Sequence, residues 1–65
     1  MRNTINLLFI ADEEEIFVQL DETDKTTTEL IEEGKDVLYD NGFESVRFVN
    51  FYTDEQAERL GLDTY

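Results

Sequence analysis

The sequence predicts a small α+β domain with the element order ββαβα: a three-stranded antiparallel sheet in the order 2-1-3, one long helix packed on one face, and a short C-terminal helix. Three features predict this class. Short segments alternate apolar and polar residues, a longer segment repeats apolar residues every three or four positions, and two Thr-x-x-Glu/Gln signatures mark helix starts. With 65 residues and no linker-like stretch, the chain is expected to form a single small acidic domain, residues 1–65.

The first two strands are predicted at Thr4–Ala11 and Glu15–Asp21. The middle of the first segment is apolar on both faces, which is typical of a central strand covered on both sides. The second segment alternates cleanly between apolar and polar residues. Because only Asp12–Glu14 separates the two segments, they are expected to form an antiparallel hairpin.

The long helix is predicted to begin at Thr26, since Thr26 and Glu29 have the spacing of a capping box. Gly34 lies in the middle of the apolar stripe of this helix, where glycine costs up to about 1 kcal/mol. We therefore expect Gly34 to let the helix axis approach a bulky sheet residue such as Phe9. Gly42 fits the left-handed residue that ends a helix in a Schellman motif.

The third strand is predicted at Ser45–Tyr52 and the short helix at Asp54–Leu60, which Thr53 and Gln56 open with a second capping box. The long helix must carry the chain past the first strand, so the third strand is expected to pair with the first, antiparallel to it. The tail, residues 63–65, is expected to be loosely held.

One long helix covers only one face of such a sheet, and strand alternation places Phe17, Val49 and Phe51 on the other face. Two interpretations of this second face stay open. Either the short helix and the tail cover it, or these three residues form an exposed apolar patch that serves as a homodimer interface.

The charge of the chain limits its partners. Seventeen acidic residues against five basic ones give a net charge of −12, which argues against direct binding to nucleic acid or to an anionic membrane. The charge therefore predicts cationic partners, a basic protein surface or metal ions, and any binding of divalent cations by the acidic clusters is expected to be weak and unspecific. Cysteine and histidine are absent, so disulfides, thiolate metal sites and the commonest general base are excluded.

We accordingly expect no enzyme activity and assign no catalytic residue, metal or cofactor. The sequence shows no signal peptide and no apolar run of about 20 residues. We therefore expect no membrane association and a cytoplasmic location.

The acidic residues of the long helix are the best indication of function. They fall in one narrow row with spacings of four, three and four residues, about 16 Å long at 1.5 Å per residue. Like charges at these spacings destabilise a helix by about 0.2–0.5 kcal/mol per pair, and their separation is comparable to that of backbone phosphates. The row consists of Glu29, Glu33, Asp36 and Asp40, flanked by Glu32, and Glu13 and Glu14 of the hairpin extend it.

In size, charge and architecture the whole chain resembles the small acidic inhibitors made by bacteriophages, DNA mimics that block restriction enzymes, CRISPR effectors or repair glycosylases; no specific motif carries this resemblance. It implies a protein-binding inhibitor, acting in the host cytoplasm if phage-encoded, that presents carboxylates to a basic DNA- or RNA-handling protein.

Other interpretations of the same residues remain open. In one of them the acidic residues form a solvated face that provides only solubility or tolerance of high salt. In another the chain is a small homodimeric structural or assembly module whose acidity serves only solubility. A partner strand adding to the edge of the second or third strand is a further interpretation.

Overall fold

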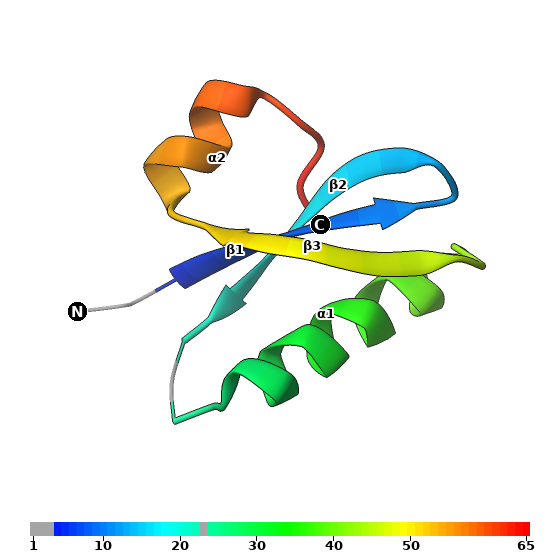
Figure 1. Cartoon of the computed structure of the whole chain (residues 1–65), viewed down its shortest axis with the longest axis horizontal. Coiled ribbons are helices and arrows are strands. Elements are labelled where there is room, and N and C mark those ends of the chain that lie inside the picture. The colour runs from blue at the N-terminus through cyan, green and yellow to red at the C-terminus, as the bar shows by residue number, and fades with distance from the viewer. Residues whose placement is uncertain (1–3, 23) are drawn as a thin grey trace.

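The computed structural model describes residues 4–22 and 24–65 and confirms the predicted architecture (Figure 1). The sheet has the order β2-β1-β3, and β1 pairs antiparallel with both neighbours. The elements are β1 (Thr4–Ala11), β2 (Glu14–Asp21), α1 (Thr27–Asp40), β3 (Val46–Tyr52) and α2 (Asp54–Leu60).

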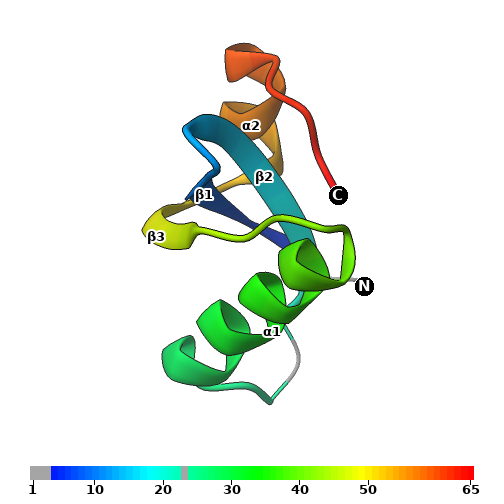
Figure 2. The ribbon, with the colours of Figure 1, turned by 90° about the vertical axis from the view of Figure 1, so that its right-hand side faces the viewer.

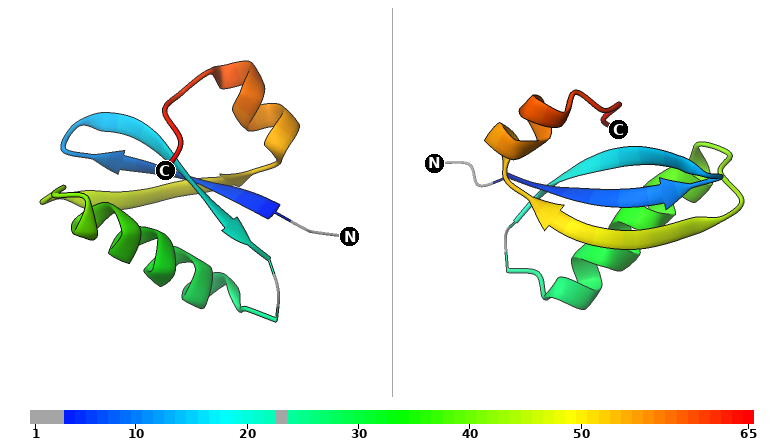
Figure 3. Two further views of the ribbon diagram at one scale, coloured as in Figure 1. Left: turned by 180° about the vertical axis from the view of Figure 1, so that it is seen from behind. Right: turned by 45° about the horizontal axis from the view of Figure 1, so that its top comes forward.

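The two helices lie on opposite faces of the sheet (Figure 2). The right-hand view of Figure 3 shows β1 between its two partners. This central place explains why the middle of β1, from Asn6 to Phe9, is buried on both faces.

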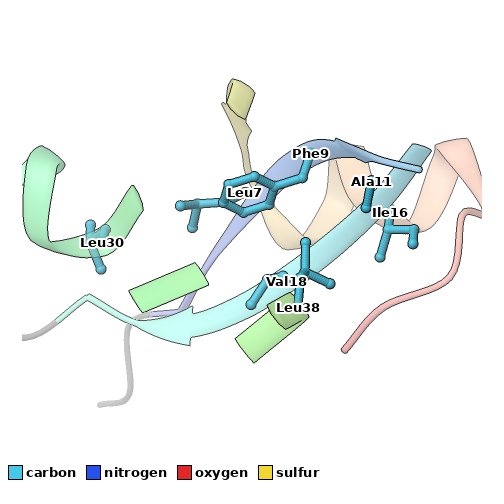
Figure 4. Close-up of a cluster of buried hydrophobic side chains, with 7 residues drawn as sticks. All are labelled: Leu7, Phe9, Ala11, Ile16, Val18, Leu30 and Leu38. Carbon is cyan, nitrogen blue, oxygen red and sulfur yellow. The ribbon is translucent and has the colours of Figure 1, made fainter. Parts of the chain in front are cut away.

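The main core fills the space between α1 and the sheet. Phe9 of β1 is fully buried, and the backbone of α1 passes directly over its ring at Gly34. A Cβ atom at Gly34 would lie only 2.7 Å from two ring carbons of Phe9. Glycine therefore permits the close approach, as the sequence predicts. The buried cluster, drawn in Figure 4, consists of Leu7, Phe9, Ala11, Ile16, Val18, Leu30 and Leu38.

Both ends of α1 have the predicted capping. At the start, the Thr26 hydroxyl accepts a hydrogen bond from the backbone N–H of Glu29 at 3.2 Å, and the Glu29 carboxylate accepts from the backbone of Thr26. At the end, Gly42 has φ +95°, and the N–H of Phe43 donates to the carbonyl of Leu38 at 3.2 Å. The left-handed Gly42 and the bond from Phe43 to Leu38 form the Schellman motif, which turns the chain back toward β3.

The pairing of β3 with β1 contains a β-bulge, which overturns one sequence-based prediction. Leu8 pairs with Asn50 and Phe9 with Phe48, so Val49 is an extra residue that shifts the alternation of side chains. As a result Phe51 pairs with Leu7 and faces α1, where its ring centroid lies 4.9 Å from that of Phe48. The prediction that Phe51 lies on the second face of the sheet is wrong.

The tail is also not loosely held, contrary to the prediction. It lies beside β2, where a parallel bridge joins Phe17 to Thr64. Phe17 N–H donates to the carbonyl of Asp63 at 2.8 Å, Tyr65 N–H donates to the carbonyl of Phe17 at 2.8 Å, and Gln19 N–H donates to the carbonyl of Tyr65 at 3.1 Å. The tail therefore covers the outer edge of β2 by bonding the backbone groups of Phe17 and Gln19. No local sequence pattern predicts this long-range pairing.

These two findings place the three residues of the predicted apolar face, Phe17, Val49 and Phe51, in different surroundings. Phe17 is 0% exposed and its ring packs edge-on against Tyr52, with centroids 5.5 Å apart. Phe51 faces α1, so Val49, at 44% exposure, is the only one of the three residues that remains exposed. The three residues therefore do not form one exposed surface.

Replacing Gly34 with alanine tests the close approach of α1. Alanine favours a helix by about 1 kcal/mol, but the new methyl group would overlap the Phe9 ring, and overpacking a rigid core costs about 1–3 kcal/mol. We expect Gly34→Ala to lower the free energy of unfolding, measured by urea denaturation. The loss should shrink when Phe9→Leu accompanies it. A gain in stability in the single variant would contradict the close contact.

Candidate protein-binding surface

Helix α1 places its acidic residues on the side that faces away from the core. Leu30, Gly34 and Leu38 are its buried residues. Because residues three or four apart share a face of a helix, the row predicted from the sequence projects from another side. Four of its five carboxylates are exposed and Glu33 is half-buried; the exposed ones belong to Glu29, Glu32, Asp36 and Asp40.

The N-terminal half of this row has local partners. The Glu29 carboxylate is occupied by the capping box, where it accepts from the Thr26 hydroxyl at 3.1 Å. The Glu33 carboxylate forms an ion pair with Lys25, which follows β2. Both residues line, with Leu20 and others, an open hollow of about 320 Å³ beside β2. Glu29 and Glu33 therefore contribute to local structure as well as to surface charge.

The other three carboxylates on this side of α1 are different. Within residues 4–22 and 24–65, Glu32, Asp36 and Asp40 make no ion pair and no side-chain hydrogen bond, and the last turn of α1 contains no basic residue. Asp36 and Asp40 lie toward the negative end of the helix dipole, which is unfavourable for anions. These three carboxylates are therefore free to accept hydrogen bonds from another molecule.

The hairpin turn brings further carboxylates to the same end of the molecule as the C-terminus of α1 (Figure 1). The Asp12 carboxylate accepts hydrogen bonds from the backbone N–H groups of Glu44 and Ser45, and Asp12 N–H donates to the carbonyl of Ser45 at 2.8 Å. These bonds join the hairpin to the loop that follows α1. Glu13 and Glu14 therefore lie at the end of the molecule where Asp40 lies, whereas Glu29 is at the other end of the helix.

The backbone of this turn is strained. Pairing of Ala11 with Glu14 leaves a two-residue loop in which Asp12 has φ +49° and Glu13 has φ +72°. Positive φ at both positions defines a type I′ turn, which strongly favours glycine at the second position. The sequence carries an exposed glutamate there instead, at a cost in stability.

A polar cluster on the opposite face of the sheet was not anticipated. The Asp54 carboxylate, in the first turn of α2, accepts hydrogen bonds from Thr4 Oγ1 at 2.5 Å, Asn6 Nδ2 at 2.6 Å and Gln19 Nε2 at 3.2 Å. These donors, Thr4 first, lower the pKa of Asp54 from its ordinary value. Its partners lie 35 to 50 residues away in the chain. No local sequence pattern therefore distinguishes Asp54 from any other acidic residue in the first turn of a helix.

Among the described residues, no three acidic side chains converge in a way that could hold a metal ion. No described helix is long and apolar enough to cross a membrane. The sequence matches no protein-family model, and comparison with curated proteins and with solved structures also gave no match.

Replacing Glu13 with glycine should stabilise the hairpin. A left-handed backbone costs an L-residue about 1–2 kcal/mol, against about 0.5–1 kcal/mol for the extra chain entropy of glycine. We expect Glu13→Gly to raise the free energy of unfolding by a few tenths to about 1 kcal/mol, measured by urea denaturation. Glu14→Gly is the matched control. Because Glu14 does not have a positive φ, this variant should be less stable than the wild type. A less stable Glu13→Gly protein would contradict the strain.

The lowered pKa of Asp54 predicts a specific dependence on pH. The stabilisation by the charged carboxylate is complete well above its ordinary value of 3.8 and is lost as the pH falls through the lower pKa of the folded state. We expect Asp54→Asn to lower the free energy of unfolding at pH 7, and the difference from the wild type to shrink on acidification. Comparing the two proteins at each pH cancels the effect of the other acids. A difference that stays constant down to pH 2 would contradict the assignment.

Proposed function

We propose that this protein is a small acidic inhibitor that binds a basic nucleic-acid-binding protein and presents carboxylates in place of backbone phosphates. The observation that supports the proposal is that three carboxylates of α1 have no partner among the described residues. Glu32, Asp36 and Asp40 are exposed, and no cation of the described chain approaches them. A basic groove that binds nucleic acid would supply the missing cations.

The cost of the row favours a role in binding over a role in solubility alone. Asp36 and Asp40 repel each other at a spacing of four residues and lie at the unfavourable end of the helix dipole. Alternating lysine and glutamate would make the helix just as soluble without this penalty. The strained turn adds a further exposed carboxylate, that of Glu13, at a position where glycine would be more stable.

The proposed action requires no catalytic group, metal or cofactor, because inhibition follows from occupying the groove. We infer that the protein works in the cytoplasm, in the host cytoplasm if a phage encodes it, since its target handles DNA or RNA there. The contact surface comprises the exposed carboxylates of α1 together with Glu13 and Glu14.

Neutralising the unpaired carboxylates tests the proposal. The protein would be immobilised and used to capture basic proteins at low and high salt, and affinities for a purified captured target would be measured by fluorescence anisotropy. We expect Asp36→Asn with Asp40→Asn to weaken binding about tenfold or more and to reduce its salt dependence, because two interfacial charges are lost.

The matched control is Glu55→Gln with Glu58→Gln, which removes the same charge from exposed positions on α2. The α1 variant should be at least as stable as the wild type, since removing like-charge repulsion gains about 0.2–0.5 kcal/mol per pair. Weaker binding therefore could not be attributed to unfolding. Equal losses in both double variants, or no loss in either, would contradict a specific role for the row.

A further inference from the structure

Residues 53–65 form a segment that we call the C-terminal flap: Thr53, α2, and the extended tail that returns to β2. Figure 2 shows α2 on the face of the sheet opposite α1, with the chain after it descending toward the sheet. The flap covers Phe17, which is 0% exposed, and the outer edge of β2. It is the part of the fold that the main core does not include.

Apolar packing of the flap is sparse. Helix α2 has no buried residue, and Leu60 is 51% exposed. Beneath the flap lies an open hollow of about 510 Å³, lined by groups of the sheet such as Asn6 and Gln19 and by Ala57 and Leu62 of the flap. The cluster between α1 and the sheet contains no residue of the flap. Among the described residues, the one aromatic contact between the flap and this side of the fold is that of the Tyr65 ring, which packs edge-on against Phe43 with centroids 5.7 Å apart. Removing the flap would break this contact at the margin of the core and leave the contacts within the buried cluster in place.

Polar contacts hold the flap at its two ends. At the start of α2, the Asp54 carboxylate accepts from Thr4, Asn6 and Gln19. At the tail, three backbone hydrogen bonds join residues 63–65 to Phe17 and Gln19. Gln19 belongs to both sets, since its side chain reaches Asp54 and its N–H reaches Tyr65. Both attachments therefore share Gln19 of β2, while Thr4 and Asn6 join Asp54 to β1.

We propose that the C-terminal flap is a lid that opens as one unit about Thr53 while β1–β3 and α1 stay folded, with Asp54 as its latch. Segments held by few apolar contacts open locally at free energies below that of global unfolding. Opening exposes Phe17 and the outward backbone groups of β2, which form an edge able to pair with another extended segment. The lid thus covers a strand-docking edge that the chain fills with its own tail.

Hydrogen exchange of the full-length protein, followed by NMR, tests this proposal. The amides of Phe17, Gln19 and Tyr65 form the hydrogen bonds that join the flap to β2, so they report opening of the flap. The amides of Val18 and Leu38 report the main core, because neighbouring residues of a strand direct their N–H groups to opposite edges. We expect the flap amides to exchange at least about tenfold faster than the core amides, under conditions where opening precedes exchange.

Three variants identify the latch. Asp54→Asn should speed exchange of the flap amides about tenfold and leave the core amides unchanged, because hydrogen bonds to a charged acceptor are the stronger ones. Glu55→Gln is the matched control: it removes the same charge from the same turn, but within the described part of the chain Glu55 pairs only with Arg59, at the surface. Thr4→Val removes one of the three donors and should give a smaller effect, which keeps the test informative if Asp54→Asn does not fold.

Flap amides that exchange at the rate of the core amides in the wild type would overturn the proposal, because the flap would then unfold only with the whole protein. Equal effects of Asp54→Asn and Glu55→Gln would overturn the role of Asp54. Faster exchange of Phe17, Gln19 and Tyr65 alone, graded from Thr4→Val to Asp54→Asn, is the result that supports it.

Discussion

The close contact between the ring of Phe9 and the backbone of α1 at Gly34 is the constraint on which the rest of the structure depends. Phe9 lies in the central strand, so the contact fixes α1 over the middle of the sheet. That position buries Leu30 and Leu38 and turns the acidic side of the helix toward solvent. In a chain of 65 residues with a net charge of −12, this small core must offset considerable self-repulsion.

Stability and charge are therefore opposed in this protein, and the structure separates them in space. Acidic groups that support the fold have partners: Glu29 caps α1, Asp12 holds the loop before β3, and Asp54 latches α2. Glu32, Asp36 and Asp40 of α1 have none among the described residues, and Asp36 and Asp40 occupy positions that weaken the helix. This division is what makes the row a candidate binding surface.

The sequence predicts what local patterns determine. Both capping boxes, the glycine within α1, the Schellman ending and the sheet order follow from spacing and alternation. Prediction from the sequence fails where one inserted residue or a partner distant in the chain determines which way a side chain faces or where a segment lies. The bulge at Val49 reverses the face of Phe51, and the tail finds its place only because β2 has an open edge. The exposed carboxylates of α1 were predictable from the helical wheel, whereas their lack of partners required the structure.

Competition with duplex DNA tests the central claim most directly. A purified target that binds both this protein and DNA would be titrated with the protein while labelled duplex is held in the complex, and release of the duplex would be followed by anisotropy. Mimicry predicts that the protein displaces the duplex completely and that saturating duplex abolishes binding of the protein. A ternary complex in which the target holds both ligands at once would contradict it.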